Sequence, residues 1–108
     1  MNAPQHKNLE QGRWFGMTLP EQLGNVGSEY SRAWRWKGAN RPDYADKAID
    51  RMLELLDLTL ADSRWRNHRL KELSRLREQV CGEFFLPDQQ PALQKYFDQF
   101  AQAARMGR

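Results

Sequence analysis

Hydrophobic residues along this chain recur at spacings of three and four, which is the period of an amphipathic α-helix. The first such segment follows Thr18-Leu-Pro-Glu21, a capping box with proline in the first turn, and we expect it to end at Gly38. Its apolar stripe consists of Leu19, Leu23, Val26, Tyr30, Ala33 and Trp34. No segment alternates with the period of two that marks a half-buried strand. The pattern therefore predicts an all-α chain.

Three later segments repeat this period. We expect a second helix to start at Asn40-Arg-Pro-Asp43, a third to run from about Arg66 to Phe85, and Asp88 to cap a last one. Their inward positions are Ala45, Ala48, Ile49, Met52, Leu55, Leu56, Thr59 and Leu60; Leu70, Leu73, Leu76, Val80 and Phe84; and Leu93, Tyr96, Phe97, Phe100 and Ala104. Short connections favour antiparallel neighbours. The predicted fold is an all-α, antiparallel up-down four-helix bundle over residues 18–108, preceded by a flexible segment over 1–17.

Composition narrows the class of protein. With 108 residues, of which 40% are apolar and 29% charged, the chain fits one soluble globular domain. The single Cys81 excludes an internal disulfide, which favours a reducing compartment. No apolar run approaches the roughly 18–20 residues of a membrane span, and the N-terminus lacks a signal-peptide pattern. We therefore expect a cytoplasmic protein.

Charge is segregated along the predicted helices. The formal net charge of +3 permits an anionic partner without demanding one. The second helix carries one acidic face, made of Asp43, Asp46, Asp50, Glu54 and Asp57, and the third region carries one basic face, made of Arg64, His68, Lys71 and Arg75. Two explanations stay open. Either the basic face meets nucleic acid while the acidic one keeps the protein soluble, or the two faces meet each other between subunits.

The stretch Ser-Arg-Ala-Trp-Arg-Trp-Lys-Gly, residues 31–38, combines indoles with cations. Trp34 lies in line with the apolar stripe and is expected in the core, whereas Trp36 falls at its flank. For a flank tryptophan, contact with a protein is favoured over stacking of bases. Arg32 and Arg35 point outward and could bind phosphate or simply be solvated. Arg77 projects near the apolar stripe, where we expect it either to extend its charged end to solvent or to pair with an acid such as Glu29 at the bundle edge.

The sequence offers little site chemistry. His6, His68 and Cys81 have no zinc-site spacing, and no Glu-x-x-His pair lies on a helix. There is also no glycine loop for phosphate and no nucleophile elbow. We therefore expect no enzyme activity, no cofactor and no metal.

Three short motifs carry a resemblance to known proteins. They are Asn-x-Gly-Ser-Glu-x-x-Arg-Ala at 25–33, Leu-Glu-Leu-Leu-Asp-Leu-Thr at 53–59 and Lys-Tyr-Phe-x-x-Phe at 95–100. In these the chain resembles a group of short, uncharacterised bacterial four-helix proteins. It is more distantly similar to the four-helix proteins encoded in 23S ribosomal RNA intervening sequences and to the accessory variability determinant of diversity-generating retroelements. Asn25, Val26 and Arg32 match that family's Asn-Ile-Ala-Glu-Gly-x-x-Arg pattern in register, while Glu29 occupies its glycine position.

The distant resemblance implies a non-enzymatic, often pentameric protein whose basic surface engages RNA or DNA and, in the retroelement case, a reverse transcriptase. We therefore expect an oligomeric accessory or scaffold protein that binds structured RNA or an RNA-handling partner such as a reverse transcriptase. The candidate nucleic-acid-binding residues are Arg32, Arg35, Arg64, His68, Lys71 and Arg75. The candidate subunit or partner interface consists of Trp36, Asp46, Asp50 and Glu54. The alternative is a protein–protein adaptor with no nucleic-acid role.

Overall fold

The computed structural model describes residues 9–107. Its elements are α1 (Leu9–Phe15), α2 (Leu19–Gly38), α3 (Pro42–Ala61), the short 3-10 turn η1 (Ser63–Trp65), α4 (His68–Phe85) and α5 (Gln94–Met106). Within this range there is no strand and the four long helices pack together, so the predicted all-α fold class is confirmed. Among the described helices, none is long and apolar enough to cross a membrane.

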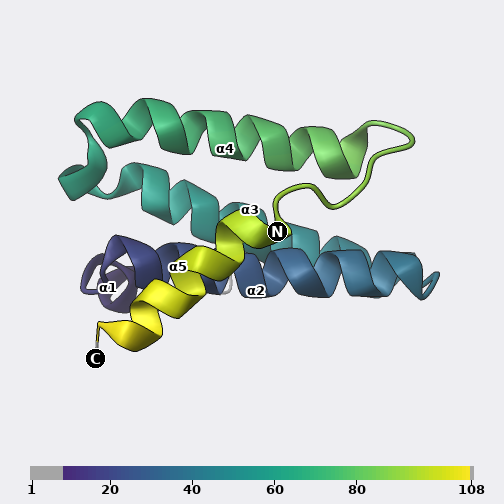
Figure 1. Cartoon of the computed structure of the whole chain (residues 1–108), viewed down its shortest axis with the longest axis horizontal. Coiled ribbons are helices and arrows are strands. Elements are labelled where there is room, and N and C mark those ends of the chain that lie inside the picture. Colours follow the sequence, from purple (N-terminus) through teal and green to yellow (C-terminus); the bar gives the residue numbers. More distant parts are fainter. Residues whose placement is uncertain (1–8, 108) are drawn as a thin grey trace.

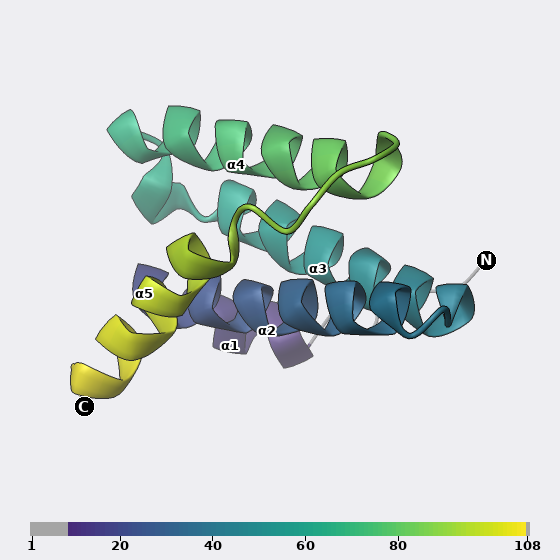
Figure 2. The same ribbon diagram turned by 45° about the vertical axis from the view of Figure 1, so that its right-hand side comes forward.

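Helix α2 is the centre of the packing. Helices α2 and α3 run antiparallel, α4 returns along α3, and α5 crosses α2 obliquely (Figure 1). The view turned by 45° shows the same crossing (Figure 2). The last helix therefore packs mainly on α2 and not along α4, the helix that precedes it in the chain.

Two glycines permit the close crossing of α5 over α2. A Cβ atom added at Gly27 would lie 2.6 Å from the Cβ of Phe97, and one at Gly24 would lie 3.3 Å from the Cα of Ala101. Phe97 is the buried residue of α5, and its ring fills the space that Gly27 leaves. The motifs at 25–33 and 95–100 are thus in contact in the folded protein. The bulky Phe97 of one motif packs at the position where Gly27 of the other motif has no side chain.

The ends of α2 differ in how well the sequence predicted them. The capping box is confirmed, since the Thr18 N–H donates to Glu21 Oε1 at 2.9 Å and the Glu21 N–H donates to Thr18 Oγ1 at 3.2 Å. Gly38, however, remains helical. The left-handed residue is Asn40, with φ of 59°, and the Arg41 N–H donates to the Trp36 carbonyl at 2.9 Å. This is a Schellman ending, so Asn40 terminates α2 and does not cap α3.

The prediction that Asp88 caps the last helix is wrong. Asp88 has a left-handed φ of 57°, and α5 begins only at Gln94. Pro87 and Pro91 disfavour helical conformation in the residues before them, so the chain stays irregular until it has passed Pro91. At the start of α5, the Leu93 N–H donates to the Tyr30 hydroxyl oxygen at 2.9 Å.

The expected flexible segment over 1–17 is corrected in its second part. Leu9–Phe15 form α1, whereas residues 1–8 lie outside the described residues. Trp14 is 1% exposed, and its indole Nε1 donates to Thr59 Oγ1 at 3.0 Å. Burying one indole ring offsets the ordering of a short polar segment.

The predicted core positions are largely confirmed, although Leu60 on α3 and four positions at α5 (Leu93, Tyr96, Phe100 and Ala104) are only half-buried. Fully buried side chains come from every long helix: Leu23, Val26, Tyr30, Met52, Leu56, Leu73, Val80 and Phe97. Leu70 was expected inward but is 37% exposed. Trp34 was expected in the core but is only half-buried, packed against its edge.

Candidate nucleic-acid interface

Arg64, a predicted phosphate ligand, belongs to what we call the polar junction: Trp14, Gln22, Asp62, Arg64 and Trp65. Asp62 is 2% exposed and accepts hydrogen bonds from Arg64 Nε at 3.0 Å and from its Nη2 at 2.7 Å. Gln22 Nε2 donates to the Trp14 carbonyl at 2.8 Å and to Asp62 at 3.0 Å, while its Oε1 accepts from Trp65 Nε1 at 2.8 Å. The junction therefore ties α1, α2 and η1 together.

The junction occupies most of the Arg64 guanidinium. Its Nη2 also donates to the Met17 carbonyl at 2.6 Å, so Nε and one terminal nitrogen are used within the protein. Hydrogen bonds from Arg64 hold the pKa of the Asp62 carboxyl below its ordinary value despite burial. We therefore assign Arg64 a structural role and leave it out of the binding surface.

The remaining predicted phosphate ligands of this region form what we call the cationic face of α4: His68, Lys71 and Arg75. The three side chains recur at spacings of three and four, and all are exposed. Leu73, Leu76 and Val80 point to the core from the other side of α4. In the described part of the chain, none of these three side chains is within ion-pair distance of a carboxylate.

The neighbouring arginines of α4, in contrast, are paired. Arg69 lies 3.3 Å from Glu72, and Arg77 Nε lies 2.7 Å from Asp57 Oδ1 on α3. The expectation that Arg77 pairs with an acid is thus confirmed, but the acid is Asp57 and not Glu29.

Glu29 turns toward α3 and away from α4. It is 5% exposed, and its two oxygens lie 2.9 Å from Arg32 Nη1 and 2.9 Å from Arg51 Nε. Arg32, a predicted phosphate ligand, is therefore engaged with a carboxylate of its own helix.

The six predicted phosphate ligands do not form one surface. Arg32 and Arg35 lie in the half of α2 whose Trp34 packs on Phe84, with ring centroids 4.9 Å apart, near the C-terminal end of α4. Lys71 and Arg75 lie in the N-terminal half of the same α4. The two pairs of cations therefore belong to different ends of the molecule, as the course of α2 and α4 in Figure 1 shows.

A second cationic region surrounds the connection from α2 to α3. We call it the aromatic turn and define it as Trp36, Arg41, Tyr44 and Lys47. The rings of Trp36 and Tyr44 are stacked, with centroids 4.8 Å apart and planes at 29°. Tyr44 is 40% exposed, and Trp36 is half-buried. Arg41 Cζ lies 4.6 Å and Lys47 Nζ lies 5.9 Å from the centroid of Tyr44.

Trp34 has a different role from its neighbour Trp36. Its Nε1 donates to Glu83 Oε1 at 3.2 Å, and Lys37 Nζ lies 5.0 Å from its ring centroid. The two indoles of residues 31–38 thus face different helices, since Trp34 packs on α4 and Trp36 on α3.

The predicted interface acids are unequal. Asp46 and Asp50 are exposed and have no ion-pair partner among residues 9–107. Glu54 is half-buried, and its Oε2 is enclosed without a hydrogen-bond partner in that range. Asp57 is held by Arg77. Among the predicted interface acids, Asp46 and Asp50 therefore present the open acidic surface.

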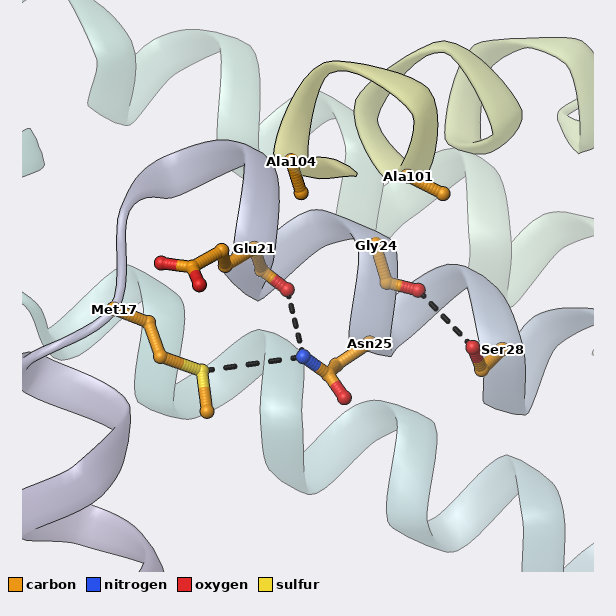
Figure 3. A pocket seen from close by; sticks show the side chains of 7 residues that line it. All are labelled: Met17, Glu21, Gly24, Asn25, Ser28, Ala101 and Ala104. Atoms are coloured by element: carbon orange, nitrogen blue, oxygen red, sulfur yellow. Dashed lines mark hydrogen bonds between the residues drawn. The ribbon is translucent and has the colours of Figure 1, made fainter. Parts of the chain in front are cut away.

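The described surface has shallow hollows. Figure 3 shows one of about 170 Å³ at the crossing of α2 and α5, which is open because small residues line it from both helices. There Asn25 Nδ2 donates to the Glu21 carbonyl at 2.8 Å, so its amide is already engaged.

A second hollow of about 230 Å³ lies beside Arg75 and Tyr96. Burial and the nearby Glu72 raise the pKa of Tyr96 to about 12, so its hydroxyl stays protonated. No group of three or more metal-ligating side chains gathers among the described residues.

Sequence reasoning missed a buried polar hub. Tyr30 donates from its hydroxyl to Glu83 Oε1 at 2.5 Å, and the same hydroxyl accepts from the Leu93 N–H. Burial and the Glu83 carboxylate raise the pKa of Tyr30 well above its ordinary value. A signal was present in the sequence, because Glu83 lies three residues after Val80 and beside Phe84 on the inward face of α4. Gln22, between Leu19 and Leu23, gave the same signal for the polar junction.

Comparisons of this chain with protein-family models, with curated proteins and with solved structures found no match.

Proposed function

We propose that this chain is a non-enzymatic accessory protein that holds structured RNA against the cationic face of α4. The observation that supports this is the contrast along one helix. Arg69 and Arg77 are each bound to a carboxylate, whereas His68, Lys71 and Arg75 are exposed together with no carboxylate partner in the described structure. Unpaired cations on one helix face attract the phosphates of a nucleic acid and release its condensed counterions.

This binding is expected to depend on the backbone of the RNA and not on its bases. Cations that contact phosphates fix position but carry no sequence information. Double-stranded RNA is recognised mainly by shape and by contacts to phosphates and 2′-hydroxyls. The distant resemblance to four-helix proteins that engage RNA agrees with this proposal.

The test reverses charge on the cationic face and on a matched control surface. The variant is Lys71→Glu with Arg75→Glu, and the control is Lys95→Glu with Arg105→Glu, two exposed cations of α5. Affinity for an RNA hairpin is measured over a range of salt concentrations. Each lost phosphate contact should flatten the logarithmic salt dependence by roughly 0.7 to 0.9. We expect this in the first variant alone. Equal losses in both variants, or no affinity in the parent protein, contradict the proposal.

A second candidate function is that of a protein–protein adaptor, and the exposed Asp46 and Asp50 on α3 favour it. Their acidic surface could meet the cationic face of another copy, which would give a homo-oligomer. In that case Lys71→Glu with Arg75→Glu should dissociate the oligomer. Adding Asp46→Lys and Asp50→Lys should restore it, because the opposed charges are exchanged. Light scattering at micromolar concentration separates the candidates. A monomeric parent protein excludes this contact between copies and does not contradict the RNA-binding proposal.

A further inference from the structure

We propose that the aromatic turn binds an unpaired base of the same RNA, so that the protein engages a duplex at one end and a single strand at the other. This inference rests on the proposed function and specifies its substrate as a structured RNA with an adjoining unpaired segment. It concerns Trp36, Arg41, Tyr44 and Lys47, residues outside the cationic face.

The geometry of the two rings supports a stacking role. Trp36 and Tyr44 come from different helices, yet their planes lie at 29° with centroids 4.8 Å apart. Tyr44 is 40% exposed, so part of its ring is available to a ligand and is not used for packing within the protein. A nucleobase is planar and extends such a stack without any requirement on its sequence, because every base has a π-face.

The charges around the rings fit the rest of a nucleotide. Arg41 Cζ and Lys47 Nζ lie 4.6 and 5.9 Å from the Tyr44 centroid. Cation–π contacts at exposed sites are weak, so either cation can turn to a phosphate at small cost. The nearest carboxylate recorded for Arg41 is Asp43, at the outer limit of an ion pair with 4.0 Å between Nε and Oδ1. The complementary partner of this turn is therefore an anion that also carries a flat ring.

The backbone holds the site in place before any ligand arrives. The Arg41 N–H bonds to the Trp36 carbonyl at 2.9 Å, Asn40 takes the left-handed conformation, and Pro42 fixes the start of α3. Two of the four site residues are thus joined by one hydrogen bond. A preorganised turn loses little conformational freedom when a base binds.

The position of the aromatic turn indicates what form of RNA could contact both the turn and the cationic face. The aromatic turn joins α2 to α3, at the end of the molecule opposite the η1 connection from which α4 starts. The longest extent of the molecule is 37 Å. We therefore expect a hairpin stem on the cationic face to reach the turn through an unpaired extension.

The experiment compares a blunt RNA hairpin with the same hairpin carrying a single-stranded extension. The parent protein should bind the extended hairpin more tightly. Trp36→Leu should weaken binding of the extended hairpin by roughly 5- to 150-fold, the range expected for one lost stacked base, and leave the blunt hairpin unchanged. Unchanged binding of the blunt hairpin also shows that the variant is folded. Tyr44→Leu should act in the same direction, and Trp36→Phe should retain most of the affinity.

Phe85→Ala is the matched control, because Phe85 is an aromatic side chain that is 64% exposed and lies outside the turn. If the parent protein binds both hairpins equally, or if Trp36→Leu and Phe85→Ala have the same effect, the inference is overturned while the proposed function stands. If the parent binds an isolated single strand through Trp36 but no hairpin, the proposed function fails and the base site remains. Absence of binding to any RNA overturns both and leaves the turn as a protein contact.

Discussion

The polar junction and the cationic face of α4 are close in sequence but use the same residue types in opposite ways. Arg64 donates hydrogen bonds to the Asp62 carboxylate and to the Met17 carbonyl, and Asp62 is in turn held by the buried Gln22. Arg75, eleven positions later, is exposed and has no carboxylate partner within the described structure. Both were predicted as members of one basic face, because their spacing fits one continuous helix.

The difference shows that an arginine becomes available for a ligand only when the fold supplies no acceptor for it. At the junction, the chain leaves α3 at Asp62 and forms a 3-10 turn before α4 begins, which carries Arg64 off the helix face. Burial of Asp62 then makes Arg64 its necessary partner, because a buried carboxylate without hydrogen bonds is costly. The junction should therefore control stability, and the cationic face should control binding.

The largest expected effect comes from removing the buried indole of Trp14 from the junction. Trp14→Ala should lower the free energy of unfolding by about 3–5 kcal/mol, as expected when a large buried ring is removed. Thr59 Oγ1 would also lose the hydrogen bond that it accepts from the Trp14 indole. Chemical denaturation monitored by circular dichroism measures this. A loss below about 1 kcal/mol would mean that α1 is not anchored as described.

Alanine substitution of the two arginines compares the regions directly. Arg64→Ala should cost about 1–2 kcal/mol of unfolding free energy, because it leaves Asp62 with fewer hydrogen bonds, a loss reduced by the exposure of the guanidinium. Arg75→Ala should change the unfolding free energy by less than about 0.5 kcal/mol, as is usual for an exposed position without partners. Affinity for an RNA hairpin should respond in the reverse order. Similar stability losses in both variants would erase the distinction between the regions.

Acid titration gives a smaller but more specific test. Arg64 lowers the pKa of Asp62 in the folded protein below its ordinary value of 3.8. The stability from this carboxylate is therefore fully present above that value and is lost as the pH falls through the lower folded pKa. Asp62→Asn should reduce the fall in unfolding free energy below pH 3.8. The comparison variant is Asp50→Asn, which removes a carboxylate from the exposed face of α3, outside the junction.

The sequence predicted the helical segments well because helix formation here follows local rules. Thr18, Leu23 and Leu56 illustrate this, since a cap and a period of three or four residues determine their environment. The end of α2 at Asn40 and the late start of α5 were missed. At both places the sequence offers a nearby signal of similar strength. Gly38 competes with the left-handed Asn40 as the end of α2, and Asp88 provides a cap signal although Pro91 disfavours helix in the residues before it.

The candidate site was less predictable, because partner choice depends on packing between distant segments. Nothing near Arg77 in sequence indicates that Asp57 and not Glu29 pairs with it, since the choice follows from how α4 lies against α3. The stack of Trp36 on Tyr44 likewise depends on the turn geometry between them. Polar residues within apolar stripes, such as Gln22 and Glu83, are the signals that sequence reasoning could have used.

The Tyr30 hydroxyl has a consequence for motion within the fold. Amide protons at the first turn of a helix ordinarily face water and exchange rapidly with solvent. The Leu93 amide is instead bonded to Tyr30 on α2, whose hydroxyl is also bonded to Glu83 on α4. Its exchange with deuterium should therefore be slow for its position and should accelerate whenever α5 separates from α2. One amide proton thus reports the lifetime of the contact that holds the C-terminal helix in place.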